Sequence, residues 1–415
     1  MKKRGFLIRL ALRNMWRHKK RTLVTASVIS LALMIYISMD AHLASMNSIS
    51  YRNIIDFESG HIQAVDPDYW EDKEELPLEH IFTLTDELEK IISSYDEVAS
   101  YADQLDFQAR MNDGIDELPV IGRGVDPDSF LEVFSLSDHI LEGEFIKSGE
   151  DRVVMGKALA DLMDLEIGDF VILLLRTRED YFDTIEAEIA GLIHTPNPKI
   201  NEYLVYYPLD RTQEILNAPE MATHLTIRLK ESSNTEAAAA ALKASLSGGS
   251  YNLKIIPWYD QEGVSVMSAK NMGNQMILSI ILLIAALGII NSVILSALER
   301  MHETGMMKAL GMERKEIISV FVFESAGIAL LGSIIGCLLG AAGVALLAEY
   351  GVDYSAAFGD MSQYGVPVLG PIYADWNPKA FVTVFIFATT VAIFSSVFPA
   401  WWAASKDPVD ALYGR

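Results

Sequence analysis

The sequence predicts a membrane α-helical bundle of four transmembrane helices, with a mixed α+β extracytoplasmic domain inserted between helices 1 and 2. Three observations lead to this fold class. Hydrophobic residues make up 51% of the 415-residue chain, although its formal net charge is −23. Four long runs contain no charged residue. Nearly all of the acidity lies in one block between the first run and the second.

The uncharged runs are long enough to cross a bilayer. They are Thr22–Met39, Asn271–Leu298, Ser325–Ala348 and Ala380–Ser405. At a rise of about 1.5 Å per residue, each helix would reach about 27 Å or more, close to the hydrocarbon thickness of a membrane. Buried helices of a large soluble protein are the alternative, but four runs with little helical amphipathicity argue against it. We predict transmembrane helices at 22–39, 271–298, 317–348 and 380–405.

The charges are divided unevenly along the chain. Residues 1–39 carry a net charge of +9, residues 40–270 a net charge of −28, and residues 271–415 a net charge of −4. The acidity therefore belongs to the middle block, and a chain of this kind is not expected to bind nucleic acid.

Lys and Arg in the short flanks of the helices predict their orientation, because basic loops stay in the cytoplasm. The loop 299–316 carries four basic residues, whereas the loop 349–379 carries only Lys379. We place three segments in the cytoplasm: the leader 1–21, the coupling loop 299–316 and the tail 406–415. The α+β domain 40–270 and the loop 349–379 then lie outside.

The first run is interpreted as an uncleaved anchor. Its basic leader is 21 residues long, and its apolar run exceeds the roughly 7–15 residues of a signal-peptide core. The nearest small-residue site, at Ala44, has His42 at its −3 position. Cys337 is the only cysteine, which excludes an intrachain disulfide and a cysteine-based zinc site.

The outer block alternates between strand and helix signals and is long enough for two subdomains. We expect strands at 60–65, 118–125, 152–155, 170–175, 185–193, 203–207 and 225–229. We expect helices at 85–93, with Thr85 as N-cap, at 156–163 and at 235–246, the last broken by Gly248-Gly249. We interpret Gly122-Arg123-Gly124 and Asp126-Pro127-Asp128 as turns and 195–198 as a loop.

Residues typical of catalysis are sparse. The sequence has no HExxH, GxSxG or Walker motif, and its histidines are scattered. We therefore expect no catalytic residue, no metal site and no cofactor in this chain. Glu324 lies within the third span, where a carboxylate is a functional suspect; we favour a structural role in which it reaches the membrane interface. An intramembrane enzyme would need Glu324 with a partner such as Asn291 or Ser292.

Small residues recur at helical spacing in two of the spans. They are Gly332, Gly336 and Gly340 in the third span and Thr22, Ala26 and Ser30 in the first. Such faces let helix backbones approach closely. Packing within one chain and a seam between two chains remain open.

The leader carries a basic stripe, because Arg9, Arg13 and Arg17 recur every four residues. This pattern suits a helix on the inner leaflet whose cations contact anionic headgroups, with Phe6, Leu7, Leu10 and Trp16 as apolar contacts. A plain topology signal is the alternative, and the two are compatible.

The loop 299–316 is unusually apolar for a segment that reverses the chain. Gly305 and Gly311 enclose Met306, Met307, Ala309 and Leu310. A short helix with outward methionines would fill a groove on a cytosolic partner.

With these motifs, the chain resembles the FtsX-like permease family that includes MacB and the LolC/LolE proteins, the mechanotransmission ABC transporters. The resemblance rests on Ala11–Asn14, Val153–Ala160, Leu165–Asp169 and Trp258, on a coupling segment with Arg300, Glu303, Gly305 and Lys308–Gly311, and on an ending with Pro399-Ala400, Asp407-Pro408 and Ala411-Leu412. Thr304 departs from the family's aliphatic residue, which should weaken a groove contact.

The resemblance implies a bacterial inner-membrane protein with a periplasmic domain and cytoplasmic termini. Two permease chains would pair, as a homodimer or a heterodimer, and a separate ATPase dimer would bind ATP and Mg and drive the periplasmic domains. The implied ATPase-coupling residues are Arg300, Glu303, Gly305, Met306, Met307, Lys308, Ala309, Leu310 and Gly311.

We favour the LolC/LolE-like branch, which releases lipoproteins from the inner membrane, with a periplasmic carrier as a further partner. MacB carries a fused ATPase, whereas only 21 residues precede the first span here, and the FtsX branch has a smaller outer domain. MacB-like export of peptides or drugs with a periplasmic adaptor is one alternative. A membrane-anchored periplasmic sensor is another.

Overall fold

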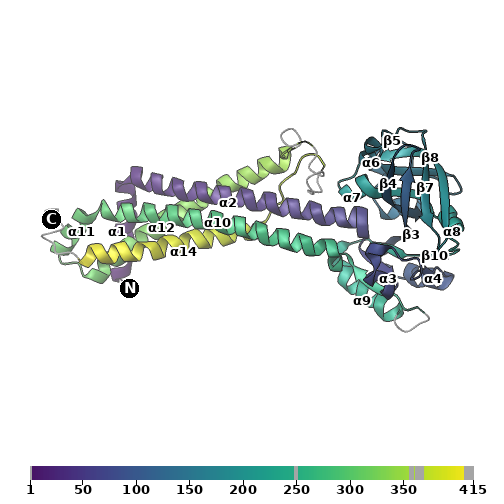
Figure 1. Ribbon diagram of the computed structural model, residues 1–415. Helices are drawn as coiled ribbons and strands as arrows, with labels where there is room; N and C mark the ends of the chain where they lie inside the picture. Colours follow the sequence, from purple (N-terminus) through teal and green to yellow (C-terminus); the bar gives the residue numbers. More distant parts are fainter. Residues whose placement is uncertain (1, 247–250, 355–358, 360–368, 406–415) are drawn as a thin grey trace. The chain divides into compact units, whose positions relative to one another are not determined.

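The computed structural model describes residues 2–246, 251–354, 359 and 369–405, and it divides into two compact units (Figure 1). The membrane unit comprises residues 1–47, 269–353 and 371–415, and the outer unit comprises residues 48–268 and 354–370. The helix break expected at Gly248-Gly249 and the chain end with Asp407-Pro408 lie outside the described residues.

Six helices account for the described part of the membrane unit. They are α1 (Lys2–Arg17), α2 (Lys19–Ile54), α10 (Glu262–Leu298), α11 (Met301–Ala309), α12 (Arg314–Tyr350) and α14 (Pro378–Ser405). Four segments are long and apolar enough to cross a membrane: Lys19–Ser59, Ala269–Leu298, Arg314–Tyr350 and Pro378–Ser405. The predicted fold class, four membrane helices with an inserted α+β domain, is confirmed.

Helices α2 and α10 are longer than the uncharged runs that predicted them. The run Thr22–Met39 marks only the apolar part of α2, which has 36 residues and a length of about 54 Å. No Gly or Pro interrupts the chain between Lys19 and Gly60, so the helix continues into polar sequence. It ends in the π-turn Ile55–Ser59, followed by Gly60 at φ +58°.

The membrane unit is packed around a core that combines large and small residues. Ile29, Leu33 and Ile37, four residues apart on α2, are almost fully buried. On α14 the buried positions Ala388 and Ala392 are small, which allows α14 to lie close to α12.

The outer unit is built on strands that close into a ring. The ring order is β3 (Val98–Asn112), β4 (Glu117–Val125), β9 (Leu204–Pro208), β6 (Arg152–Gly156), β8 (Phe182–Ile193) and β7 (Phe170–Arg176), which pairs again with β3. β5 (Ile140–Gly143) adds to β8. This barrel leaves few free edges, which explains how the domain is held together without a disulfide.

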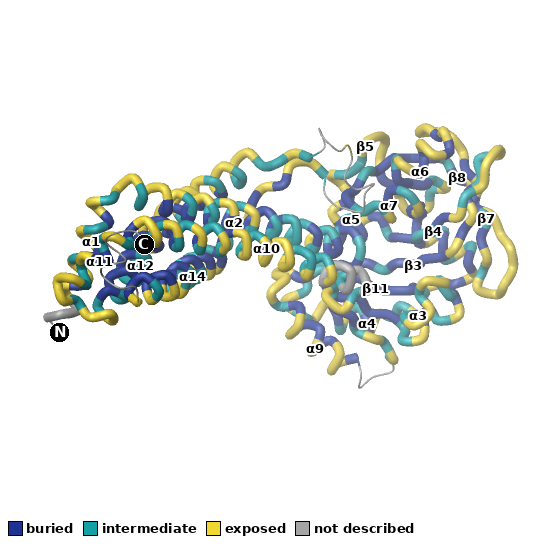
Figure 2. The backbone as a smooth tube through the Cα atoms, turned by 60° about the vertical axis from the view of Figure 1, so that its left-hand side comes forward, coloured by how far each residue is buried: buried dark blue, intermediate teal, exposed yellow. Residues whose placement is uncertain are grey.

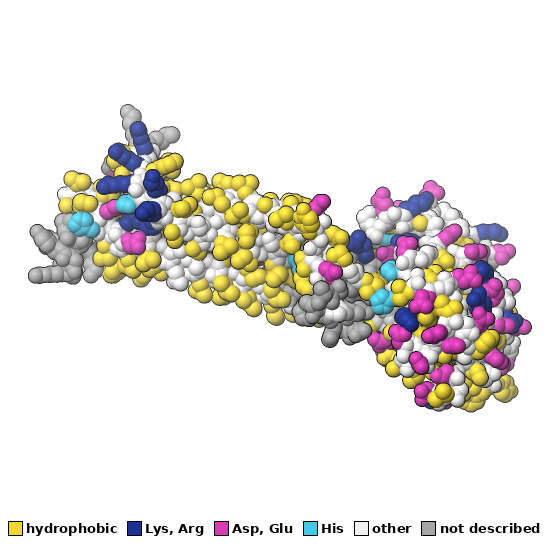
Figure 3. Space-filling model, turned by 90° about the horizontal axis from the view of Figure 1, so that it is seen from above, with side chains coloured by type: hydrophobic (Ala, Val, Ile, Leu, Met, Phe, Trp, Pro, Cys, Tyr) yellow, Lys and Arg dark blue, Asp and Glu magenta, His cyan; other side chains and the backbone are white. Residues whose placement is uncertain are grey.

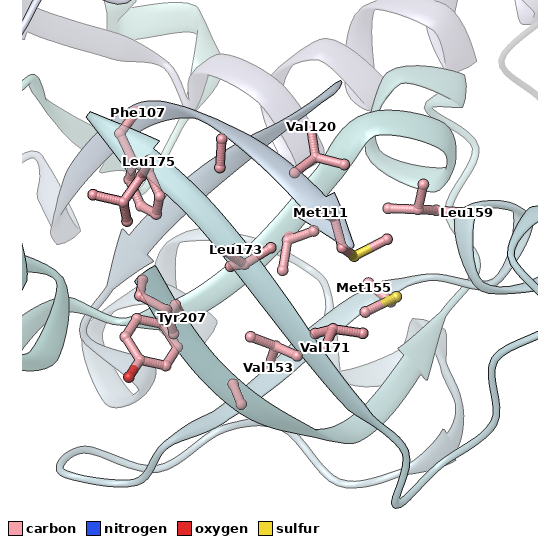
Figure 4. Close-up of a cluster of buried hydrophobic side chains, with 14 of the residues drawn as sticks. Phe107, Met111, Val120, Val153, Met155, Leu159, Val171, Leu173, Leu175 and Tyr207 are labelled. Atoms are coloured by element: carbon pink, nitrogen blue, oxygen red, sulfur yellow. The ribbon is translucent and has the colours of Figure 1, made fainter. Parts of the chain in front are cut away.

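Side chains that alternate along each strand fill the barrel. Val171, Leu173 and Leu175 of β7 point inward, toward Phe107 and Met111 of β3 (Figure 4). Short helices surround the barrel: α5 (Pro127–Val133), α6 (Lys157–Leu162), α7 (Pro198–Tyr203) and α8 (Leu209–Ile215).

A second lobe shares strand β3 with the barrel. Its sheet continues through β11 (His224–Leu229), β1 (Ile62–Val65) and β12 (Lys254–Pro257). Helices α4 (Asp86–Ser93) and α9 (Thr235–Leu246) cover it, and buried segments run through β3 and β11 (Figure 2). The smaller elements are α3 (Pro67–Glu71), β2 (Phe82–Thr83) and β10 (Met221–Ala222). The two expected subdomains are therefore two cores on one continuous sheet.

Two interpretations of glycine and proline motifs were wrong. Gly122 and Gly124 lie inside β4, not in a turn. Glycine is required at both positions, since a Cβ at Gly122 would overlap the Phe107 ring and one at Gly124 would overlap Thr212. Asp126-Pro127-Asp128 begins helix α5, where the Asp126 carboxylate accepts a hydrogen bond from the Ser129 amide.

Candidate functional site

The loop 299–316 folds as a short helix followed by a tight turn. Helix α11 runs from Met301 to Ala309, and Gly311 adopts φ +89° with open space around it. Glu313 and Glu316 then form a capping box that begins α12. A left-handed glycine and a strong N-cap allow the chain to reverse within a few residues.

One side of α11 presents apolar side chains to solvent. Leu310 is 86% exposed, Met306 is 45% exposed, and Ala309 is also exposed. Met307 instead packs toward a small core that includes Ile317 and Phe321. Of the two methionines expected to face outward, Met306 does so.

The opposite side of α11 faces the membrane unit. The Lys308 Nζ donates a hydrogen bond to the Ala404 carbonyl at 3.3 Å, near the end of α14. Gly305 and Thr304 are buried, and the Thr304 hydroxyl donates to the Arg300 carbonyl at 3.2 Å. The Thr304 side chain points into its own chain, so any effect of Thr304 on a groove contact would be indirect, and the expected weakening stays a prediction.

Arg300 and Glu303, two of the predicted coupling residues, form ion pairs behind the exposed face. The Arg300 Nε donates to a Glu303 oxygen at 2.8 Å, and the His18 Nε2 lies 2.9 Å from the other oxygen. Burial alone would raise the pKa of Glu303, but Arg300 and His18 outweigh it and hold that pKa below its usual range. These residues position α11 and do not form its exposed surface.

Glu324 is buried at this end of the bundle and is bound by two arginines. The Arg21 guanidinium donates to one of its oxygens at 2.6 Å, and Arg300 donates to the other. Glu324 is 3% exposed, so its carboxylate faces the interior of the helix bundle, which fits the predicted structural role. That it reaches the membrane interface stays a prediction. With both oxygens engaged by cations, the carboxylate is unsuited to act as a general base with Asn291 or Ser292.

The glycine ladder packs within one chain. A Cβ at Gly332 would lie 2.9 Å from the Ile29 Cβ and 3.0 Å from the Ala26 carbonyl oxygen, and one at Gly336 would lie 2.9 Å from the Ser30 Cα. Gly340 is equally close to Ile37. Thr22 lies at the start of the same α2 helix, where its hydroxyl donates to the Met15 carbonyl. The small residues therefore allow close contact between α12 and α2.

Helix α1 has three parallel stripes. Leu7, Ala11 and Met15 are buried against α12, with Leu10 partly buried beside them. The apolar residues Ile8, Leu12 and Trp16, together with Phe6, are exposed. The predicted cationic residues Arg9, Arg13 and Arg17 form the third, exposed stripe. Basic side chains gather where α1 lies (Figure 3).

One group of potential metal ligands occurs among the described residues. Asp66, Asp68 and His80 place their ligand atoms within 4.8 Å of one another. Asp66 already serves as the N-cap of α3, accepting from the Asp68 amide at 2.9 Å. Exposed acidic groups of this kind are common without an ion, so the predicted lack of a metal site stays a prediction.

Sequence reasoning missed the ion pairs around α11 as a cluster. Each charged residue was visible, and Glu324 was notable as a carboxylate within a span. Arg21 and Glu324 are 303 positions apart, so no local spacing connects them. The sequence did offer one indication, because a carboxylate within a span needs a partner of opposite charge.

The described part of the membrane unit therefore combines membrane-length helices with a short helix whose exposed side is apolar. Two family models agree, one for a MacB-like periplasmic core domain over residues 22–245 and one for an FtsX-like permease C-terminal domain over residues 276–408. The chain belongs to this family of ABC transporter permeases.

Three relatives illustrate the breadth of the similarity. An uncharacterised ABC transporter permease of Methanocaldococcus jannaschii is 24% identical over 70% of this chain and 69% of its own length. The macrolide export ATP-binding/permease protein MacB of Escherichia coli is 26% identical over 56% of this chain, but the match spans only 34% of MacB. The lipoprotein-releasing system transmembrane protein LolC of Xylella fastidiosa is 21% identical over 71% of this chain and 73% of LolC.

Two solved structures are also similar. The periplasmic region of MacB from Actinobacillus actinomycetemcomitans is 12% identical, covers 53% of this chain and 96% of that region, and gives a TM-score of 0.37. The extracellular domain of the transporter YknZ from Gram-positive bacteria is 14% identical, covers 47% of this chain and 98% of that domain, and gives a TM-score of 0.33.

Proposed function

We propose that this chain is the permease subunit of a mechanotransmission ABC transporter. A separate ATPase dimer binds ATP and Mg²⁺ and docks on α11, and its movement is transmitted through α2 and α10 to the outer domain. The chain itself catalyses no reaction and holds no cofactor. The observation that carries the proposal is the exposed apolar face of Met306, Ala309 and Leu310, on a short helix that is held by ion pairs from behind.

The proposal includes a location and a second permease chain. The protein lies in a bacterial inner membrane with cytoplasmic termini and a cytoplasmic α11, and the outer domain is periplasmic. Support comes from the net charge of +9 over residues 1–39, from the four membrane-length helices and from the periplasmic domains of its relatives.

For the substrate, we propose lipoproteins that are released from the inner membrane toward the outer membrane. The support is the similarity to LolC, which spans 73% of that protein. Export of small molecules is the second candidate, supported by the similarity to MacB. Reconstitution with the ATPase partner in proteoliposomes distinguishes them, because ATP-dependent release of a lipoprotein and ATP-dependent movement of a macrolide are separate assays.

Docking is tested by a Met306→Asp/Leu310→Asp double variant. Buried apolar anchors contribute most of the binding energy of an interface, so two carboxylates there should reduce copurification of the ATPase subunit about tenfold or more. Ile115→Asp is the matched control, because Ile115 is 91% exposed but lies in the outer unit. Wild-type copurification by the double variant would contradict the proposal.

A further inference from the structure

A network of buried and part-buried ion pairs lies behind the docking face of α11. It consists of His18, Arg21, Arg300, Glu303 and Glu324, which we call the Glu324 cluster. The Arg300 and Glu324 side chains are each 4% exposed, and the Arg21 side chain is 15% exposed. The cluster belongs entirely to the membrane unit.

Glu324 is the central member, because it bridges two cations. One oxygen accepts from Arg21 at 2.6 Å and the other accepts from Arg300. Arg21 also donates to the Ser296 carbonyl of α10 at 3.4 Å, and the Arg300 guanidinium lies 5.3 Å from the centre of the Phe321 ring. The Glu324 carboxylate of α12 therefore meets α2 through Arg21 and the start of α11 through Arg300, and Arg21 also links it to α10.

Stability alone is a poor explanation for such a cluster. Removing charges from water is costly, and well-packed apolar residues often replace a buried ion pair without loss of stability. What charged groups add is geometry, because hydrogen bonds between a carboxylate and guanidinium groups are directional and weaken steeply with misalignment. The cluster therefore fixes how α11 sits against the neighbouring helices.

The elements joined by the cluster are those needed for transmission. Arg300 is the residue directly before α11, so a displacement of the docking helix moves it. Arg21 is near the start of α2, a single helix that runs from Lys19 to Ile54 and leads along the chain into the α+β domain. Glu324 lies between them.

We propose that Glu324 is a positioning residue that ties the docking helix α11 to α2, so that a displacement of α11 is passed into α2. This inference rests on the proposed function. Without the carboxylate, Arg21 and Arg300 would face each other, and α11 could move without α2.

The test uses a Glu324→Gln variant in the complete permease with its ATPase partner. Glutamine has nearly the same size but no charge, and the docking face is unchanged. We expect normal ATPase copurification and continued ATP hydrolysis. Transport per ATP should fall about tenfold or more, within the usual range of coupling between sites. Glu299→Gln, which changes an exposed acid beside Arg300, is the control and should behave as the wild type.

Hydrogen–deuterium exchange provides a readout that does not depend on the substrate. In the wild type, trapping the ATPase with ATP and vanadate should change exchange in α11 and in residues 35–54 of α2. In Glu324→Gln the change in α11 should remain, and the change in 35–54 should be lost. A responsive wild type with an equally responsive Glu324→Gln variant would overturn this inference alone; an unresponsive wild type would overturn the proposed function as well.

A triple variant, Arg21→Met/Glu324→Leu/Arg300→Met, separates positioning from folding, because apolar residues of similar volume restore packing without the ionic bridge. We expect it to fold, because Glu303, which loses Arg300 in this variant, is only part-buried and keeps His18 as a partner, and we expect it to remain uncoupled. Wild-type transport per ATP in this variant would overturn the proposal. If Glu324→Gln does not fold, the triple variant gives the same decision.

Discussion

At the scale of single residues, two aspartates on β3 have opposite environments. Asp106 is buried and receives two hydrogen bonds from Arg123, both at 2.7 Å. Burial alone would raise the pKa of Asp106, but the charge of Arg123 outweighs it and lowers that pKa. Asp103 has no such partner: burial, followed by Glu89 and Asp126, raises its pKa to about 7. The ionised Asp106 carboxylate therefore stabilises the folded state, whereas the ionised Asp103 carboxylate destabilises it.

An Asp103→Asn variant should therefore stabilise the protein at neutral pH and above. Because the pKa of Asp103 is raised, the folded state keeps this proton to a higher pH than the unfolded state does. The contribution of Asp103 to the free energy of unfolding therefore falls as pH rises from about 4 to about 7. Removing the charge should raise the free energy of unfolding by about 4 kcal/mol at pH 8 and change it little at pH 4. Thermal unfolding of the purified chain at both pH values measures this difference.

Asp106→Asn is the matched control and should have the opposite sign. A lowered carboxyl pKa contributes stability above the ordinary aspartate pKa, and this contribution is lost as pH falls through the folded value. The variant also leaves Arg123 buried without its partner, which costs about 3–5 kcal/mol. Equal effects of the two substitutions would contradict this account.

At the scale of elements, α1 shows how a short helix can present three faces of different chemistry. Leu7, Ala11 and Met15 attach it to α12, and a Cβ at Gly327 would lie 2.7 Å from the Met15 sulfur, so contact is close. In Figure 1, α1 runs crosswise to α2. Its exposed apolar and basic stripes have the chemistry of a membrane surface, so we propose that Arg9, Arg13 and Arg17 contact anionic headgroups.

An Arg9→Gln/Arg13→Gln/Arg17→Gln variant tests the headgroup contact. Each basic residue near an anionic surface contributes about 1 kcal/mol, so anionic lipid in nanodiscs should raise the unfolding temperature of the wild type more than that of the variant. The control removes the same charge from the outer unit, with Arg110→Gln, Arg176→Gln and Lys199→Gln, all at exposed side chains. An equal lipid effect in both variants would refute the contact.

At the scale of the whole molecule, the uneven charge distribution predicts the side of the membrane on which each unit lies. The net charge of −28 over residues 40–270 belongs almost entirely to the outer unit, whereas the leader is strongly basic and the α11 loop, although neutral overall, carries four Lys and Arg residues. The positive-inside rule therefore predicts a cytoplasmic α11, on the side where we propose that the ATPase partner lies.

Labelling of single cysteines checks this orientation. Cys337 is the only cysteine, so a Cys337→Ser chain is a clean background. In intact spheroplasts, a membrane-impermeant maleimide should label Ile115→Cys, while His302→Cys on α11 should react only after lysis. Ile115 and His302 are both exposed, so accessibility of the side chain does not bias the comparison. The reverse pattern would place the outer unit in the cytoplasm.

The local elements that could be predicted are those with strong local signals. The helix over 235–246 and the Thr85 N-cap, whose hydroxyl accepts from the Leu88 amide, match their predictions. Strand β3 was missed, although it has 15 residues and joins both lobes. Its charged positions, among them Asp103 and Asp106, conceal its pattern, because a partner supplied by another strand neutralises Asp106.

The sequence by itself determined the four spans, the acidic insert, the apolar loop 299–316 and the family, because apolarity, charge and motif are properties of neighbouring residues. Only the tertiary structure decided that the outer strands close into a barrel, that the glycines of α12 pack on α2, and that Met306 and Leu310 face out while Arg300 and Glu303 face in. The bond from Arg21 to Glu324 joins residues 303 positions apart. A buried charge must find an opposite charge, but only the folded chain determines which one it meets.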